Sequence, residues 1–282
     1  MVKIGIVGFG FVGGAVAHGF AQSAELFIYD KYDDSYNTLK EVVDNSDFIF
    51  ICVPTPMKED GSQDLSYLDD AIRSISWLSK GRKIVIIKST VLPKTTRKYS
   101  EEFVNLDFVF NPEFLTERTA KLDFINPSRI VLGGDESIVD KVEEFYRTRF
   151  PVAPIYKTSF EGAELVKYMN NAFFALKISF LNEVFDIADY LDVDFESLRN
   201  MWLADYRIAN SHTDVPGHDG KRGYGGKCFP KDVNAIIKWA EKNGLNFDTA
   251  VAADKVNERV RDEKDWFDIK GATVRKKYGS IG

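Results

Sequence analysis

The sequence predicts an α/β fold in which a Rossmann doubly wound parallel sheet is followed by an all-helical second domain. Two observations lead to this prediction. In the first half of the 282-residue chain, short apolar runs of strand length alternate with helical patterns, which is typical of parallel strands joined by crossover helices. After Pro151 and Pro154 the strand-like runs stop and helical periods take over. We therefore expect domains at 1–155 and 156–266 and a tail at 267–282.

The first predicted strand, residues 3–7, runs directly into a glycine-rich turn and a helix of small residues. The turn reads GFGFVG. In dinucleotide-binding folds the first glycine permits the tight turn, the second lets a pyrophosphate approach the backbone, and the third lets helix and strand pack closely. Because the pattern stands between a strand and a helix, it predicts cofactor contacts from Gly8, Gly10, Phe11, Val12 and Gly13.

The second predicted strand, residues 26–29, ends at Asp30. A carboxylate about 20 residues beyond the glycine turn binds the adenosine ribose hydroxyls in such folds. Because it would repel the 2′-phosphate of NADP, Asp30 favours NAD as the cofactor. The neighbouring Lys31 weakens this preference, and an ordinary turn residue at a strand end is the alternative interpretation of Asp30.

Further strands are predicted at 47–53, 83–88, 107–110 and 129–132, and helices at 65–78 and 137–147. Ligands of parallel sheets bind at the carboxyl ends of the strands. The candidate residues at those ends are Val53, Thr55, Ser89, Thr90, Glu113 and Glu117. Thr55 and Ser89 are equally typical of turns and helix caps. Glu113 and Glu117, two acids in an apolar-flanked loop, suit ligand binding or base catalysis.

The second half opens with a long predicted helix, at whose start Thr158 and Glu161 match a capping box. Lys167 and Asn171 lie four residues apart in this helix, so both project from one face. A solvated pair is the ordinary interpretation. Apolar neighbours such as Phe173 indicate instead that the helix is largely buried, and buried polar groups need partners.

Residues 223–232, with the sequence GYGGKCFPKD, contain the candidate nucleophile. Pro230 is typical of the first turn of a helix, so Cys228 is expected just before a helix N-terminus and Asp232 one turn into it. The helix dipole, Lys227 and Lys231 would favour the thiolate over the thiol, which is the condition for a nucleophilic cysteine. The alternative is a small hydrophobic residue packed at the start of the helix.

The formal net charge of -6 argues against a general nucleic-acid-binding protein and favours small-molecule partners. Cys52 lies inside an apolar run and is expected to be unreactive core. Because no signal-like N-terminus and no membrane-length apolar run is seen, we expect a cytoplasmic protein. The polar loop 211–220 holds His212 and His218 without cysteines or carboxylates at zinc-binding spacing, so no metal is predicted. Further helices are expected at 195–203 and 247–266.

Together these motifs resemble the UDP-glucose 6-dehydrogenase branch of the nucleotide-sugar (UDP-glucose/GDP-mannose) dehydrogenase family. The matching stretches are GFGFVG at 8–13, VPTP at 53–56, KSTV at 88–91, NPEFL at 111–115, ELVKY at 164–168 with Asn171, and the Cys228 segment. They occur in family order up to about Arg259. The resemblance implies NAD as cofactor, oxidation of UDP-glucose to UDP-glucuronate, a homodimer formed through the helical domain, and a role in polysaccharide biosynthesis.

In this family two successive oxidations convert the sugar C6 alcohol to an aldehyde and then, through a cysteine thiohemiacetal and thioester, to a carboxylate. Carried over by motif, Cys228 is the nucleophile, and Glu113 is the general base of thioester hydrolysis, supported by Thr90. The residues that would surround the reacting oxygen and its water are Lys167, Asn171 and Asp232.

The same resemblance implies the ligand contacts. Ser89 and Glu117 would contact the cofactor. The sugar-nucleotide site would be lined by Phe114, Leu115, Tyr224 and Gly225, together with Lys167 and Asn171. Arg207 matches an arginine that reaches the substrate across a subunit interface.

The chain also departs from the family pattern. The family normally continues into a third domain that holds much of the uridine nucleotide, and this chain is expected to lack it. Lys227 stands where serine is usual and Arg118 where glycine is common.

Two other functions are therefore considered. A single-oxidation enzyme like the 3-hydroxyacid and 6-phosphogluconate dehydrogenases has a similar plan and a Lys-x-x-x-Asn pair. Cys228 argues against it, since one oxidation needs no thiol. A non-catalytic NAD-binding subunit, or a fragment completed by another chain, is the second alternative.

Overall fold

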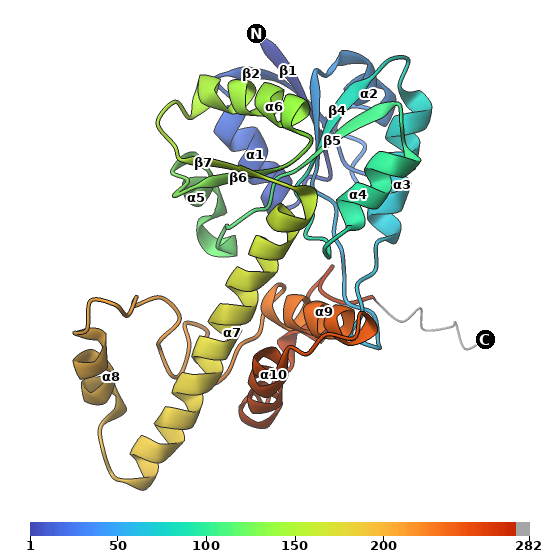
Figure 1. The fold of residues 1–282 in the computed structure, drawn as a ribbon. Coiled ribbons are helices and arrows are strands. Elements are labelled where there is room, and N and C mark those ends of the chain that lie inside the picture. The colour runs from blue at the N-terminus through green and yellow to red at the C-terminus, as the bar shows by residue number, and fades with distance from the viewer. Residues whose placement is uncertain (275–282) are drawn as a thin grey trace. The chain divides into compact units, whose positions relative to one another are not determined.

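The computed structural model describes residues 1–274 of the chain (Figure 1). These residues form two compact units. The first comprises Met1–Thr55 and Asp64–Lys167, and the second comprises residues 56–63 and the chain from Tyr168 onward. Helix α7 (Phe160–Tyr190) begins in the first unit and continues in the second, so it links them covalently.

A seven-stranded sheet forms the centre of the first unit, in the order β2-β1-β3-β4-β5-β6-β7 (Figure 1). Its strands are β1 (Val2–Val7), β2 (Ala24–Tyr29), β3 (Phe48–Ile51), β4 (Lys83–Ile87), β5 (Leu106–Phe110), β6 (Ile130–Gly134) and β7 (Ile155–Thr158). All neighbouring strands are parallel except β5 and β6. The predicted Rossmann fold is confirmed. The chain passes from β2 back across β1 to β3, which creates the switch point at which dinucleotides bind.

Helices cover both faces of this sheet, which is why its central strands read as continuous apolar runs. One face carries α1 (Phe11–Phe20), α5 (Ala120–Ile125) and α6 (Glu136–Arg149), and the other carries α2 (Leu39–Asn45), α3 (Ser66–Leu78) and α4 (Thr95–Glu102) (Figure 1). Phe20, fully buried at the end of α1, packs against the rings of Phe50, Phe124, Phe145, Tyr146 and Phe150.

The antiparallel pairing of β5 with β6 was not expected. A parallel neighbour needs a crossover that returns the chain to the opposite end of the sheet. The segment after β5 holds only the 3-10 turn η1 (Glu117–Thr119) and the short α5. The chain therefore enters β6 from the same end of the sheet at which it leaves β5. The edge strand β7 was also missed, because its sequence IYKT is mostly exposed and lacks an apolar pattern.

The start of α7 differs from the capping-box match by one residue. Thr158 is the last residue of β7. Ser159 precedes the helix, and its Oγ accepts a hydrogen bond from the backbone N–H of Gly162 at 3.1 Å. The N-terminal cap is therefore Ser159.

The second unit is helical and contains the rest of α7, α8 (Phe195–Leu203), α9 (Phe229–Lys242) and α10 (Asp248–Val260). Helices α9 and α10 lie side by side (Figure 1) and share with α7 a core of Ala175, Tyr224, Val233, Ile237 and Ala250. The helix predicted at 247–266 ends at Val260, and a separate 3-10 turn, η2 (Asp265–Phe267), follows.

The beginning of the predicted tail is held in the second unit. The Met57 N–H donates to the Ala272 carbonyl, and the Val274 N–H donates to the Met57 carbonyl, both at 2.8 Å. Ala272 and Trp266 pack with Met57 in a small apolar cluster. Residues 275–282 of the predicted tail lie outside the described residues.

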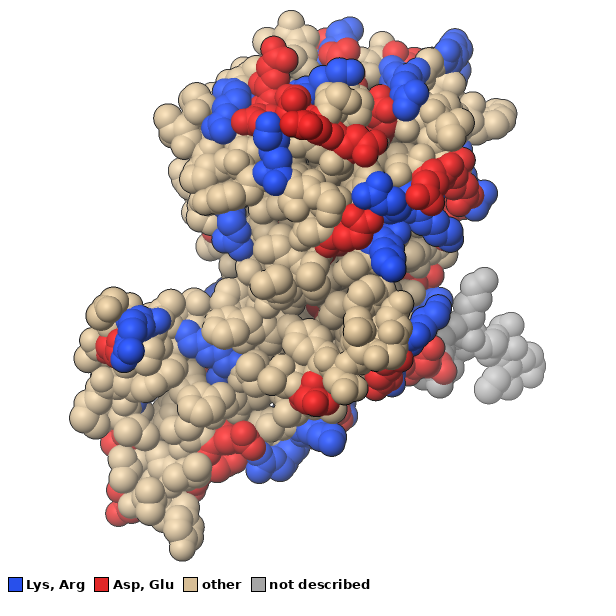
Figure 2. All heavy atoms as spheres, viewed as in Figure 1, with Lys and Arg blue, Asp and Glu red and all other residues tan. Residues whose placement is uncertain are grey.

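Charged side chains of both signs are interspersed on the face shown in Figure 2. Many form ion pairs in the first unit, such as Arg97 with Glu161 at 2.7 Å and Lys157 with Asp140 at 2.8 Å. Among residues 1–274, every helix is too short or too polar to cross a membrane.

Candidate functional site

The glycine turn after β1 has the geometry that a dinucleotide pyrophosphate needs. Gly8 has a φ of +91°, in the left-handed region, and a Cβ at Gly13 would lie 2.1 Å from the Gly8 carbonyl oxygen. Gly10 is exposed at the N-cap of α1, with open space where a Cβ would be, and the first turn of α1 holds no acid. The predicted Phe11 and Val12 begin this helix. The open N-terminus of α1 therefore fits the anionic part of NAD.

Asp30 follows β2 and is tied to this turn. Its Oδ2 accepts a hydrogen bond from the Phe9 N–H at 2.8 Å, and its Oδ1 accepts one from the Tyr32 N–H at 2.9 Å. The second bond is the local turn that the alternative interpretation implies. The first places the carboxylate beside the cofactor turn, where a ribose-binding acid is expected.

The strand-end residues after β3 and β4 contact one another. The buried Thr55 donates its hydroxyl to the Thr90 carbonyl at 2.9 Å, and the buried Ser89 donates its hydroxyl to the Val53 carbonyl at 2.7 Å. Both hydroxyls thus brace neighbouring loops of the sheet edge. The four predicted residues form one structured rim within the first unit.

Glu113 and Lys167 form a buried ion pair, although 54 residues separate them in the sequence. The Lys167 Nζ lies 2.7 Å from Oε1 of Glu113, and their side chains are 5% and 6% exposed. Oε2 of Glu113 accepts the Leu115 N–H at 2.8 Å. Burial alone would raise the pKa of Glu113, but the charge and hydrogen bond of Lys167, aided by the Leu115 amide and by Lys88, lower it. The Glu113 carboxylate is therefore ionised at neutral pH.

A second buried cation, Lys88, lies next to this pair and was not singled out from the sequence. Its Nζ donates to the side-chain oxygen of Asn111 at 2.8 Å, and the same oxygen accepts the Tyr146 hydroxyl at 2.6 Å. Burial lowers the pKa of Lys88 to about 8. Only its place at the end of an apolar strand, beside the Ser89-Thr90 cluster, could have indicated this network.

Lys88 and Glu113 line a cavity of about 310 Å³ in the first unit. Phe114 and Leu115 also line it, and the guanidinium of Arg129 lies 4.1 Å from the centre of the Phe114 ring. This cation–π contact fixes the loop that follows Glu113. Glu117, predicted to contact the cofactor, is exposed at the start of η1.

In the second unit, the structure brings the predicted Asn171 and Asp232 together across 61 residues of sequence. Both are buried, and Nδ2 of Asn171 donates to Oδ2 of Asp232 at 2.6 Å. The ammonium of Lys231 pairs with the other carboxylate oxygen. Cys228 is the N-cap residue of α9, with Pro230 in the first turn, and is half-buried. The predicted helix start is thus confirmed, and Asp232 lies one turn into it.

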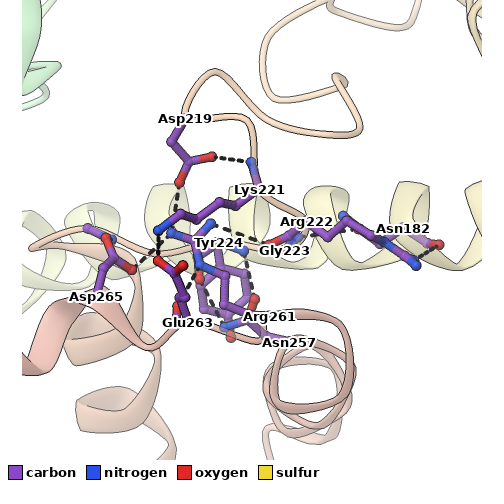
Figure 3. Close-up of polar contacts among 11 residues, drawn as sticks. Asn182, Asp219, Lys221, Arg222, Gly223, Tyr224, Asn257, Arg261, Glu263 and Asp265 are labelled. Atoms are coloured by element: carbon purple, nitrogen blue, oxygen red, sulfur yellow. Dashed lines mark hydrogen bonds and ion pairs between the residues drawn. The ribbon is translucent and has the colours of Figure 1, made fainter.

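The glycine-rich segment before Cys228 packs on the end of α10 (Figure 3). Tyr224 is buried, and its hydroxyl donates to Asp254 at 3.3 Å. A Cβ at Gly225 would lie 2.3 Å from Nη2 of Arg261. The buried Tyr224 ring is part of the core of this unit. It is therefore the backbone of this segment that can contact a ligand.

Arg207 is placed apart from these residues. Its side chain is 74% exposed and is paired with Asp205, whose Oδ1 lies 2.9 Å from Nε. The loop that carries it is anchored by the buried Arg199, which contacts Thr213 and Asn210 at 2.9 and 2.8 Å. Arg207 is therefore displayed at the surface by a well-braced loop.

Two family models match most of this chain. The NAD binding domain of the UDP-glucose/GDP-mannose dehydrogenase family matches residues 30–149, and the central domain of the same family matches residues 161–259. The chain belongs to the UDP-glucose/GDP-mannose dehydrogenase family. The glycine turn at 8–13 lies before the matched residues and supports the NAD-binding assignment independently.

Individual members of the family show the same relation. The UDP-glucose 6-dehydrogenase YwqF of Bacillus subtilis is 37% identical over 220 residues, which are 75% of this chain and 48% of that protein. A UDP-glucose dehydrogenase structure from Pyrobaculum islandicum has a TM-score of 0.81 and 33% identity, over 92% of this chain and 68% of that one. A UDP-D-ManNAc dehydrogenase structure from Pyrococcus horikoshii has a TM-score of 0.79 and 25% identity, over 92% and 69%.

Family membership confirms the resemblance seen in the motifs and confirms NAD as the cofactor. The chain spans about half the length of the curated relatives it matches. The substrate and the roles of single residues remain predictions.

Proposed function

We propose that the protein oxidises C6 of a nucleotide sugar in two NAD-dependent steps, with UDP-glucose and UDP-glucuronate as the preferred substrate and product. The observation that carries the proposal is the placement of Cys228 at the N-terminus of α9, with the buried Asp232–Asn171 pair one turn beyond it. A helix N-terminus stabilises a thiolate, and a thiol is needed only if an aldehyde must be oxidised further. In this proposal residues 1–155 bind NAD and residues 156–266 carry the nucleophile.

NAD, when bound, supplies the hydride acceptor for both oxidations. In the first, the C6 hydroxyl loses its proton while its carbon loses a hydride, which leaves an aldehyde. Asp232 serves as the acceptor of the hydroxyl proton. The ammonium of Lys167 and the amide of Asn171, one helical turn apart on α7, stabilise the negative charge that develops on the oxygen.

The thiolate of Cys228 makes the second oxidation possible. It adds to the aldehyde carbon, and the carbonyl oxygen becomes an alkoxide stabilised by Lys167 and Asn171. When the carbon then loses its hydride, the carbonyl reforms and the product is a thioester. The sulfur has changed the aldehyde into a tetrahedral centre from which a hydride can leave.

Glu113 completes the reaction by hydrolysis. Water adds to the thioester carbon as Glu113 takes one of its protons, and the C–S bond breaks to release the Cys228 thiolate and the acid, which loses its remaining proton to solvent. The ion pair with Lys167 supports this role, because it lowers the pKa of Glu113 and keeps the carboxylate ionised. The rim formed by Thr55 and Thr90 would help to order the water.

The homodimer is part of the proposal, and an exposed stripe on α7 supports it. Met169, Phe173, Phe180 and Ile187 are 57%, 60%, 50% and 58% exposed, so the burial expected around Phe173 is not observed. Their spacings of four and seven residues place them along one helix face. Exposed apolar stripes of this kind mark protein interfaces. A second copy of this chain, with the same stripe, is the partner that fits it, as the family resemblance implies.

The deciding experiment is the number of NADH formed per sugar consumed. Purified protein is incubated with NAD and, separately, UDP-glucose, UDP-ManNAc or GDP-mannose. Two NADH per sugar and an acid product are expected with UDP-glucose. One NADH, or turnover only of simple hydroxyacids, would instead favour a single-oxidation enzyme.

The variant Cys228→Ala separates the two oxidations. It removes the thiol and keeps the start of α9, so the second oxidation is expected to fall by at least a hundredfold. Full two-step turnover by this variant would rule out the covalent route. Binding of the nucleotide sugar without any turnover in the parent protein would favour a non-catalytic subunit.

A further inference from the structure

The segment before the candidate nucleophile is held residue by residue. Residues 223–226, here called the glycine loop, end two positions before Cys228. Gly223 and Gly226 have φ values of +68° and +75°, in the region that other residues rarely adopt. A backbone segment of this kind stays in a single conformation only if neighbouring groups contact and fix it.

Asn257 of α10 holds the first half of the glycine loop (Figure 3). Its Oδ1 accepts the Tyr224 N–H at 2.6 Å, and its Nδ2 donates to the Tyr224 carbonyl at 3.0 Å. A Cβ at Gly223 would lie 2.3 Å from the same Oδ1. The amide of Asn257 therefore pairs with both backbone groups of Tyr224, as a neighbouring β-strand would. It leaves room only for a glycine before Tyr224.

Arg261 and Asp265 hold the second half (Figure 3). The Arg261 side chain is 1% exposed, and its Nη2 lies 2.7 Å from Asp219 and 2.9 Å from Asp265. Asp265 uses its other oxygen to accept the Gly226 N–H at 3.0 Å.

Arg261 also donates to the backbone just before the loop and to the backbone just after α10. Its Nε donates to the Glu263 carbonyl at 3.0 Å, and its Nη1 donates to the Arg222 carbonyl at 3.3 Å. Because two carboxylates already pair with the guanidinium, Arg261 acts through geometry rather than through unbalanced charge. Arg261 and Asp265 lie beyond the last residue, 259, that the family's central-domain model matches.

We infer that Asn257, Arg261 and Asp265 are positioning residues that hold the glycine loop and thereby aim Cys228 at the N-terminus of α9. The inference rests on the proposed role of Cys228. The amides at a helix start stabilise a thiolate only when the sulfur points at them. Because the glycine loop is fixed at Tyr224 and Gly226, it also restricts the position of the next two residues, the second of which carries the sulfur.

The test is the rate at which iodoacetamide alkylates Cys228 as a function of pH. In a Cys52→Ala background Cys228 is the remaining cysteine, and burial raises the pKa of Cys52 to about 12 in the parent. Arg261→Lys and Asp265→Asn are each expected to slow alkylation at neutral pH by about tenfold, equivalent to about 1.4 kcal/mol. The rate at high pH, where the thiol is fully ionised, should stay near that of the parent. Lys227, Lys231 and Asp232 are unchanged in both variants.

Arg259→Lys is the matched control. Arg259 lies in the last turn of α10, two residues before Arg261, but is 58% exposed and pairs with Glu183, so the alkylation profile of this variant should equal the parent's. Asp265 is 29% exposed, and circular dichroism should show that Asp265→Asn folds even if Arg261→Lys does not. An Asp265→Asn profile that superimposes on the parent's would overturn the inference.

The readout separates this inference from the proposed function, because alkylation needs neither NAD nor sugar. A shifted profile in a protein that forms no NADH would support the positioning role and count against the dehydrogenase. An unshifted profile in a protein that forms two NADH per sugar would support the dehydrogenase and count against the positioning role.

Discussion

At the scale of single residues, the burial of the Glu113–Lys167 ion pair makes it sensitive to mutation. Lys167→Met is expected to destabilise the first unit by about 3 kcal/mol, because it leaves a buried carboxylate without its partner. The double variant Glu113→Gln/Lys167→Met should recover most of that loss. Urea unfolding measures both. Lys157→Met removes an exposed lysine with two acidic partners and should change little.

The pair also makes stability depend on pH. Because the pKa of folded Glu113 is lowered from 4.5, its stabilising contribution is present above about pH 4.5 and is lost as the pH falls through the folded-state value. In Lys167→Met only the Leu115 amide and Lys88 still oppose burial, so the pKa of Glu113 should rise and the stability that the parent gains above about pH 4.5 should shrink. A Lys167→Met variant as stable as the parent at every pH would contradict the buried ion pair.

At the scale of secondary structure, α4 is capped by a side chain from another helix. Its N-cap residue, Lys94, has a φ of +76° and supplies no side-chain cap. The fully buried Glu164 of α7 instead accepts the Lys94 and Thr96 N–H groups at 2.8 and 2.7 Å. Burial raises the pKa of Glu164 from 4.5 to about 7, despite these bonds.

This cap predicts a second pH dependence, with the opposite sign. A raised folded-state pKa means that the contribution of Glu164 is complete below about pH 4.5 and is lost as the pH rises through about 7. Between these limits the parent should lose about 2 kcal/mol relative to Glu164→Gln, which keeps an acceptor but cannot ionise. Thermal unfolding over this range measures the difference. A constant offset between the two proteins would show that Glu164 does not titrate there.

At the scale of the whole molecule, the α7 stripe predicts the oligomeric state. Phe173→Asp combined with Phe180→Asp places two charges in the proposed interface. It should weaken dimerisation by at least about 2 kcal/mol, roughly 30-fold. Light scattering over a range of concentrations measures this. Trp77→Asp, at an 85% exposed aromatic of the first unit, is the control and should leave the parent's state unchanged. A monomeric parent would remove the dimer from the proposal.

Some contacts were predictable because their signals are local. Gly8, Gly10 and Gly13 are required by one turn, and Pro230 with Cys228 marks one helix start, so neither depends on distant parts of the chain. The network of Lys88, Asn111 and Tyr146 was not predictable in this way. Its members come from three separate elements, and a buried lysine in the sequence looks like any other lysine.

The sequence by itself determined the family, the Rossmann sheet, NAD as cofactor and the place of Cys228 before a helix, because each depends on residues that are neighbours in the chain. Tertiary structure decided the direction of β6, the capping of α4 by Glu164, and the contacts of Arg261 with the glycine loop. These depend on which distant groups meet once the apolar surfaces are buried. Buried polar atoms must then take whichever partners lie within reach.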